Sequence, residues 1–422
     1  LATNYFNSIF QDTGGVLWFG TNSEGISQWD PRTEVFRDYS YPFGSEEINS
    51  YPRGIYEAEE NDLWVGTAAG GLVHYNTSSG FFENFKHSLK NPHTLSHDNL
   101  TFVVPDPLNS HLLWIGSSYG LNCFDKVKKI VYRYFNSTTV DHEESNNFRC
   151  ALPQPDGTLW LGTGGGGMYH FDPLTGTFEN SRHDPQNSIG LSNDFINFIH
   201  RARSGYLWIG TALGLNRFDP KTESFKTYFS QSPPLINSQV FSICETDDGT
   251  LWIGTLGEGL IRFDPVKEQV VKIYDAKDGL LNSQVMGILA DQKKNLWIAT
   301  GGGMYKFDPL TGHFTLFDSG DGLLSGQFIK PAFSGKNGRF YFGHLKGILA
   351  FFPDQVKIND HVPPVVITDC QADSRHVNLF PLMQSGQELE FSYKDRVISF
   401  EFAALDFAAP QKNRYAYRLK GF

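Results

Sequence analysis

The side chains best able to bind a ligand stand where a short repeated pattern is broken. His344 ends the last copy of this pattern, where the other copies carry Thr or Ser, and Lys346 follows it. Arg53 and Arg149 occupy a position that is otherwise uncharged, and Glu258 is the lone acid at its own position. Aromatic rings suit the faces of sugar rings, and guanidinium groups suit their acidic substituents. Each residue taken singly also fits an ordinary surface or packing role. The candidate ligand-binding residues are Tyr5, Tyr51, Arg53, Tyr119, Asn147, Arg149, Glu258, His344 and Lys346.

Motifs for catalysis and for metal binding are missing from the sequence. The run Gly164–Gly167 lacks the Lys-Ser/Thr pair of a phosphate loop, and Asp247-Asp248-Gly249 lacks the spaced acids of a calcium loop. No Gly-x-Ser-x-Gly elbow occurs, and the four Cys residues have no zinc-ligand spacing and are interpreted as core residues. We therefore expect no catalytic residue, no metal, no cofactor and no enzyme activity in this chain.

The repeated pattern itself reads Leu-Trp-apolar-Gly-Thr, with small variations. From one Trp to the next the steps are 46, 50, 46, 48, 44 and 45 residues, and a worn eighth copy with Tyr341 follows after 44 more. A fixed period in this range marks a repeat architecture. The clear copies are centred on Trp18, Trp64, Trp114, Trp160, Trp208, Trp252 and Trp297.

Each repeat unit predicts four short strands. In one unit they are 240–245, 251–254, 259–263 and 270–274, separated by Gly- and Asp-rich turns, and Asp264-Pro265 ends the third strand. Four strands in about 45 residues make one blade of a β-propeller. Eight units predict an all-β ring with either eight blades, or seven blades and one displaced unit; strands from the two ends of the chain can close such a ring. The repeated Trp is expected to be structural, because it recurs in every unit.

The repeat stops after Pro353, and the last unit has no clear fourth strand beyond Val356-Lys357-Ile358. Strand-like runs then occur at 365–368, 388–393, 397–402 and 415–419. Three or four strands are few for a free-standing sandwich. We predict a β-propeller over 1–358 and the N-terminal part of a truncated β-sandwich over 359–422.

Composition excludes several classes of protein. The 422 residues are 15% aromatic and 19% charged, which favours a large packed core over disorder. The net charge of −11 argues against a nucleic-acid partner. There is no apolar run of about 18 residues and no visible signal peptide, and since the first residue is Leu1 we expect an excised or processed piece.

The unit Leu-Trp-Ile-Gly-Thr…Gly-Leu…Phe-Asp-Pro resembles the two-component-regulator propeller repeat. The segments Phe402–Phe407 and Tyr415–Gly421 resemble the start of the Tyr-Tyr-Tyr sandwich domain that follows such propellers. The resemblance implies the periplasmic or extracytoplasmic sensor region of a bacterial hybrid histidine kinase in the inner membrane, sensing glycan fragments. The kinase, the membrane helix and the receiver would lie outside this chain, and a homodimer of the full-length receptor stays open. Members usually carry two seven-bladed rings, whereas eight units are counted here.

Two further hypotheses stand beside the sensor. A propeller lyase acting on a polysaccharide or a cyclic ester would use His344 or His200 as its catalytic residue, and a protein-interaction scaffold would need no small ligand. For the sensor we predict that the loops entering the first strands and those joining the second and third strands gather at one mouth of the ring. Arg and Lys there favour an acidic oligosaccharide.

Overall fold

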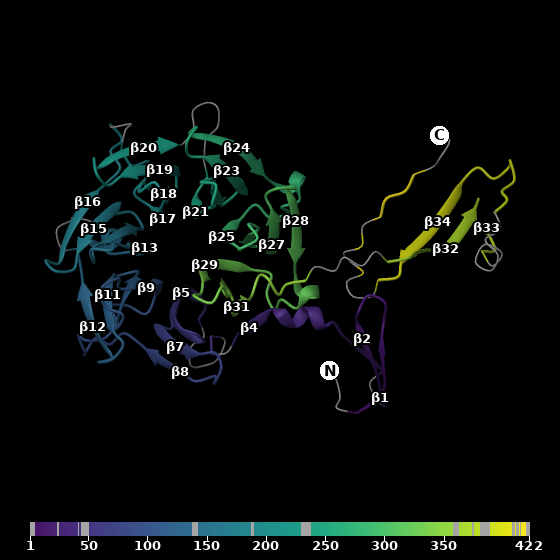
Figure 1. Cartoon of the computed structure of the whole chain (residues 1–422), viewed down its shortest axis with the longest axis horizontal. Helices are drawn as coiled ribbons and strands as arrows, with labels where there is room; N and C mark the ends of the chain where they lie inside the picture. The colour runs from purple at the N-terminus through teal and green to yellow at the C-terminus, as the bar shows by residue number, and fades with distance from the viewer. Residues whose placement is uncertain are drawn as a thin grey trace. The chain divides into compact units, whose positions relative to one another are not determined.

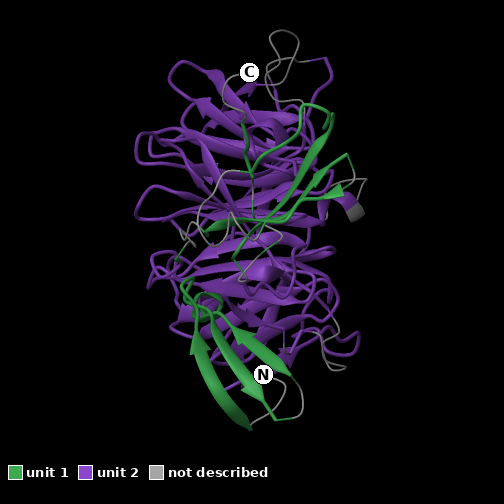
Figure 2. Ribbon diagram, turned by 90° about the vertical axis from the view of Figure 1, so that its right-hand side faces the viewer, with its two compact units in different colours: residues 1–34, 357–422 green, residues 35–356 purple. Residues whose placement is uncertain are grey.

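The structure, a computed structural model, describes residues 5–22, 25–40, 42–43, 50–136, 142–186, 190–228, 238–357, 363–373, 375–379, 389–406, 410, 413 and 415–418. They are mostly short strands, and the described helical pieces are α1 (His142–Ser145), η1 (Pro31–Val35), η2 (Ala276–Asp278) and η3 (Ser319–Asp321). No helix in these ranges is both long and apolar enough to cross a membrane. The chain forms two compact units, Val35–Val356 on the one hand and Leu1–Glu34 with Lys357–Phe422 on the other (Figure 2).

The unit Val35–Val356 is a ring of seven antiparallel four-stranded sheets (Figure 1). The first strand of each sheet contacts the first strand of the next, and β29 contacts β5, so the ring is closed. The sheets are therefore the blades of a β-propeller with the first strands innermost. Blades 1 to 3 are formed by β5 (Pro52–Glu59), β6 (Asp62–Thr67), β7 (Leu72–Asn76) and β8 (Phe82–Phe85) in blade 1; by β9 (Leu100–Pro105), β10 (Leu112–Ser117), β11 (Gly120–Asp125) and β12 (Ile130–Tyr134) in blade 2; and by β13 (Phe148–Pro153), β14 (Leu159–Thr163), β15 (Met168–Asp172) and β16 (Thr177–Ser181) in blade 3. Blades 4 and 5 are formed by β17 (Ile196–Arg201), β18 (Leu207–Thr211), β19 (Gly214–Asp219) and β20 (Ser224–Tyr228) in blade 4, and by β21 (Val240–Glu245), β22 (Leu251–Thr255), β23 (Leu260–Asp264) and β24 (Gln269–Tyr274) in blade 5. Blades 6 and 7 are formed by β25 (Val285–Ala290), β26 (Leu296–Thr300), β27 (Gly303–Asp308) and β28 (His313–Phe317) in blade 6, and by β29 (Phe328–Ser334), β30 (Phe340–His344), β31 (Gly347–Phe351) and β4 (Arg37–Tyr39) in blade 7.

Blade 7 decides between the two predicted rings. Its outer strand is β4, which precedes blade 1 in the chain and pairs with β31 from Ile348↔Tyr39 to Ala350↔Arg37. The eight-bladed alternative is therefore wrong, and the ring has seven blades with one repeat unit divided. The first three strands of that unit lie outside the ring, whereas its fourth strand closes it. The domain limits 1–358 and 359–422 stay a prediction.

Six of the seven repeated Trp residues, all except Trp18, lie at the seams between blades. In six seams the Trp packs against a Phe near the end of the third strand of the next blade, with ring centroids between 4.7 and 5.6 Å apart. Trp252, for example, is 2% exposed and lies 5.4 Å from Phe307. The seam from blade 7 to blade 1 differs, because Tyr341 replaces Trp and its hydroxyl donates to the buried Glu57 carboxylate at 2.6 Å. The prediction that the Trp is structural is confirmed in the ring, where five of the six Trp residues are buried and the half-buried Trp160 makes the same seam contact.

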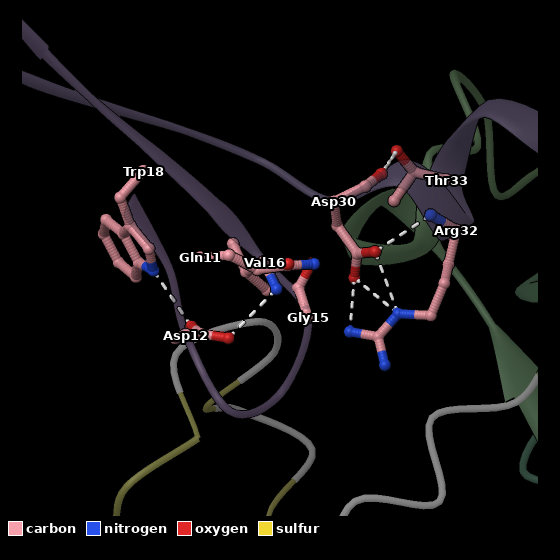
Figure 3. A network of polar contacts seen from close by, with 8 residues as sticks. All are labelled: Gln11, Asp12, Gly15, Val16, Trp18, Asp30, Arg32 and Thr33. Atoms are coloured by element: carbon pink, nitrogen blue, oxygen red, sulfur yellow. Dashed lines mark hydrogen bonds and ion pairs between the residues drawn. The ribbon is translucent and has the colours of Figure 1, made fainter. Parts of the chain in front are cut away.

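The first repeat unit forms a separate three-stranded sheet of β1 (Phe6–Gln11), β2 (Leu17–Thr21) and β3 (Ile26–Trp29). Its turn is held by Asp12, which accepts from the Val16 amide at 3.0 Å and from the Trp18 indole at 2.9 Å (Figure 3). The same indole–carboxylate bond recurs at 2.8 Å in blade 2, between Trp114 and Asp106. The unit therefore keeps the local chemistry of a blade outside the ring.

The C-terminal residues form a second three-stranded sheet, ordered β33 (Arg375–His376), β32 (Val365–Ala372) and β34 (Ile398–Ala404). The predicted strands at 365–368 and 397–402 are thus present. The described parts of the predicted strands 388–393 and 415–419 are not in strands, so these two predictions are wrong there. Residue 388 and residue 419 lie outside the described residues.

Candidate functional site

A β-bulge breaks the pairing of the first and second strands at the same level in each of the seven blades. In blade 1, for example, Pro52 pairs with Thr67 and Gly54 with Gly66, which leaves Arg53 unpaired. A bulge adds one residue to one strand and turns its side chain out of the ladder. The residues that stand in the bulges are Arg53, Thr101, Arg149, Asn197, Phe241, Met286 and, in a longer bulge of blade 7, Ile329, Lys330 and Pro331.

Most of these bulge residues line one cavity of about 170 Å³ in the centre of the ring. Since the first strands are innermost, side chains that leave their ladders there meet at the axis. No Asp or Glu is among the lining residues. The lining residues are Tyr51, Arg53, Thr101, Arg149, Phe241, Met286, Ile329, Lys330 and Leu345. We call this the channel cavity.

The loops that enter the first strands and those that follow the second strands share one mouth, as predicted. In every blade a main-chain amide just after the second strand donates to a carbonyl just before the first strand. Examples are Ala68 to Tyr51 at 3.0 Å and Leu256 to Gln239 at 3.0 Å. The residues on both sets of loops therefore surround the same opening of the ring.

Three cations meet in the channel cavity and form no ion pair with any described residue. Arg53 donates to the Asn99 amide oxygen at 3.0 Å. The Arg149 guanidinium lies 4.3 Å from the Phe195 ring centroid, and its Nε has no partner among the described residues. Burial lowers the pKa of Arg149, and the charge of Arg53 lowers it further.

Lys330 crosses the channel from blade 7 to blade 4. Its amine donates to the main-chain carbonyl of Asn197 and lies 5.0 Å from the Phe198 ring centroid. Desolvation lowers the pKa of Lys330 to about 8, and the charges of Arg149 and Arg53 act in the same direction. The side chain of Asn197 is 1% exposed, and neither polar atom of its amide has a partner within the described ranges. The centre of the ring is therefore cationic and rich in unused hydrogen-bonding groups.

The structure brings three of the predicted residues, Tyr51, Arg53 and Arg149, into the channel cavity. Asn147 stands at the mouth, where its carbonyl accepts from Gly164 at 2.9 Å, but it does not line the cavity. Tyr119 lies on a mouth loop against Phe135, with ring centroids 5.6 Å apart.

Glu258 lies on the mouth loop of blade 5, and its Oε2 is buried without a partner among the described residues. Lys346 is exposed on the mouth loop of blade 7. Tyr5 precedes β1 in the other compact unit and is not part of the ring.

His344 has a different position from the one expected of a ligand-binding residue. It is fully buried, its Nε2 lies 3.1 Å from Asp38 Oδ2 on β4, and its Nδ1 accepts from the Lys346 amide at 3.2 Å. In the other blades Thr or Ser at this position bonds within its own turn, as Thr67 does to the Gly71 carbonyl at 2.9 Å. The larger imidazole instead reaches the closing strand, so His344 does not line the channel cavity.

His200, the other candidate of the lyase hypothesis, lies near the hairpin end of β17, away from the mouth. Its Nε2 is 3.4 Å from Glu245 Oε2, and burial lowers the pKa of His200. In the described residues no group of three or more His, Cys, Asp or Glu side chains could hold a metal ion. Neither histidine reaches the cavity in which the three cations meet.

Sequence reasoning missed six of the nine lining residues, namely Thr101, Phe241, Met286, Ile329, Lys330 and Leu345. Lys330 stands eleven residues before Tyr341, as Arg53 does before Trp64, so counting back from the worn copy would have found it. In blade 2 the turn between the first two strands is longer, because Leu113 pairs with Pro105 whereas in blade 1 Leu63 pairs with Glu57. The count from Trp114 therefore reached Val103, which is buried, instead of Thr101.

Comparison with known proteins agrees with this fold. Residues 1–23 and 234–257 match the two-component-regulator propeller repeat. Over 99% of its length the chain is 25% identical to a histidine kinase of Formosa agariphila, and it spans 31% of that protein.

Among solved structures, the extracellular domain of a protein from B. thetaiotaomicron, described as a one-component system, superposes with a TM-score of 0.62 at 20% identity. The alignment covers 97% of this chain and 55% of that one. The surface component PorZ of the type-IX secretion system of Porphyromonas gingivalis gives 0.56 at 15% identity, covering 80% of this chain and 51% of that one. These two likenesses establish the propeller fold, and this chain spans about half the length of each.

Proposed function

We propose that this chain is the ligand-sensing region of a bacterial hybrid two-component receptor and that it binds a glycan or oligosaccharide fragment at the mouth of its ring. The match of two segments to the two-component-regulator propeller repeat and the similarity to a histidine kinase support the first part. On this proposal the region lies outside the cytoplasm, and a kinase elsewhere in the receptor carries the signal onward. Residues 359–422 would begin the Tyr-Tyr-Tyr sandwich domain.

The observation that carries the second part is the set of bulge residues in the channel cavity. The ring repeats its strands and its seams, yet the residue at the bulge changes from blade to blade, from Arg149 to Phe241 and Met286. Repeat proteins often bind their ligands at a face where one layer of side chains varies between repeats whose strands are otherwise alike. Partly exposed polar and aromatic groups around a concave opening also suit a small ligand.

The test is calorimetric titration of the whole chain with a panel of neutral and acidic oligosaccharides. We expect one of them to bind, and Arg149→Ala to weaken that binding by roughly 1.5–3 kcal/mol, the range for hydrogen bonds to charged groups. Binding of an acidic member should weaken as salt is added, because charges at the open mouth are screened over about 8–10 Å at physiological ionic strength.

Arg203→Ala is the matched control. Arg203 is exposed at the hairpin end of blade 4, where it pairs with Asp247 at 2.6 Å, so its loss should leave ligand affinity unchanged. An oligosaccharide that binds equally well to the Arg149→Ala variant, or that is located on the outer rim or on the β32–β34 sheet, would contradict the proposed site. Formation of a cleavage product by the purified chain would favour the lyase instead.

A further inference from the structure

The bulge residues divide the channel cavity into two chemically different sides. Blades 7, 1, 2 and 3 contribute Lys330, Arg53, Thr101 and Arg149 to its lining, and these residues carry cations and a hydroxyl. Blades 5, 6 and 7 contribute Phe241, Met286, Ile329 and Leu345, which are apolar. A ligand that fills the cavity therefore meets a cationic side and an apolar side at the same time.

None of the described residues that line the cationic side carries a negative charge. Arg53 bonds to a neutral amide, Arg149 lies on an aromatic ring and Lys330 bonds to a carbonyl. This arrangement occurs in a chain whose net charge is −11. Holding like charges together without an acid is unfavourable, so the balance is restored when an anion enters. A planar carboxylate suits an Arg fork, which it can meet through two parallel hydrogen bonds.

The size of the cavity limits the ligand group that enters. Its volume of about 170 Å³ is below the roughly 300–1,000 Å³ of pockets that enclose drug-sized ligands. It therefore accommodates a compact unit, and any longer chain would continue out of the mouth past Tyr51.

We propose that the channel cavity is a subsite for one hexuronic acid unit, with its carboxylate among Arg53, Arg149 and Lys330 and the C–H face of its ring against Phe241 and Met286. A hexuronate combines a single planar anion with an apolar ring face, and these are the two surfaces that the cavity offers. The inference rests on the proposed function, because it names the sugar class that the same mouth would recognise. The buried amide of Asn197, which has no partner among the described residues, lies in the same layer of bulge residues, beside the main-chain carbonyl that accepts from the Lys330 amine.

The experiment uses three monosaccharide probes of similar shape, namely D-glucuronate, D-glucose and D-glucose 6-sulfate, each titrated into the whole chain. Glucuronate should bind at least about tenfold more tightly than glucose, since hydrogen bonds to charged groups correspond to roughly 10- to 150-fold in affinity. Arg149→Ala and Arg53→Ala should each remove about tenfold or more of the glucuronate affinity by the same reasoning. Arg203→Ala should leave it unchanged, and the melting temperature of each variant reports whether the ring is intact.

Equal affinities for glucuronate and glucose would overturn the inference, and so would retention of glucuronate affinity in both folded Arg variants. Tighter binding of the sulfate than of glucuronate would overturn the assignment to a carboxylate. If a neutral oligosaccharide of the panel binds at the mouth while glucuronate does not, the sensor proposal stands and this inference is wrong. If glucuronate binds through Arg149 while no panel member binds, the uronate subsite stands and the proposed oligosaccharide ligand is wrong.

Discussion

Replacing Lys330 with Met should make the protein more stable at pH 7. The Met side chain follows the stem of Lys330 and fills the same space without a charge. The pKa of Lys330 falls from 10.5 to about 8, and at 1.36 kcal/mol per unit this corresponds to a penalty of roughly 3 kcal/mol for the charged form. Loss of the hydrogen bond to the Asn197 carbonyl lowers the free energy of unfolding of the variant by about 1 kcal/mol and so reduces this gain. The expected net gain is about 2 kcal/mol in the free energy of unfolding.

The pH dependence provides the sharper test. Between pH 8 and 10.5 the unfolded chain holds a proton on Lys330 that the folded chain has released. The stability of the wild type therefore rises with pH through this window relative to the Met variant, and the advantage of the variant shrinks. Urea denaturation of both proteins at pH 7 and pH 9.5 measures the two differences.

Lys346→Met is the matched control, because Lys346 is exposed and the same substitution there should change stability by no more than about 0.5 kcal/mol. If Lys330→Met lowers stability at pH 7, and by the same amount at pH 9.5, then the amine is not desolvated in the folded protein and the reasoning fails.

Two further predictions concern the seams between the blades. Trp252→Ala should destabilise the ring by roughly 3–5 kcal/mol, the usual value for truncating a buried aromatic side chain. An unchanged melting temperature would show that the packing of Trp252 in this seam does not contribute to stability. Tyr341→Phe should lower the free energy of unfolding by about 1.5–3 kcal/mol, because it removes a hydrogen bond to the buried Glu57 carboxylate. Tyr228→Phe should change it by less than about 1 kcal/mol, since its partner Glu268 keeps its ion pairs with Arg217 and Lys226; equal effects of the two Tyr→Phe changes in urea denaturation would contradict this reading.

The repeated parts of the fold could be predicted from the sequence because they depend on local chemistry. The strands, the turns and the burial of the Trp residues all follow from the unit around Trp252. The number of blades could not, because β4 is only three residues long and Arg37–Tyr39 carry no sign of a partner more than 300 residues later. Pairing between distant strands is a tertiary contact that a local pattern does not encode.

The candidate site was predicted in part. Arg53 and Arg149 differ from their neighbours in a position that the repeat defines, and that contrast was visible in the sequence. Lys330 was missed because its blade carries Tyr341 in place of Trp. His344 was selected for breaking the pattern, and the structure places its imidazole outside the lining of the channel cavity, fully buried and 3.1 Å from Asp38 on β4.

The strand that enters the ring and the strand that leaves it are neighbours in one sheet. β4 and β31 are joined by three residue pairs, and the chain before β4 and the chain after β31 both depart from blade 7. A force that separates the two flanking segments would therefore act on the ladder between β4 and β31. Lys330 lies on β29 of the same sheet, so blade 7 both lines the channel cavity and carries the strands at which the chain enters and leaves the ring. Blade 7 is therefore the blade through which a ligand in the channel cavity and the two flanking segments share one sheet.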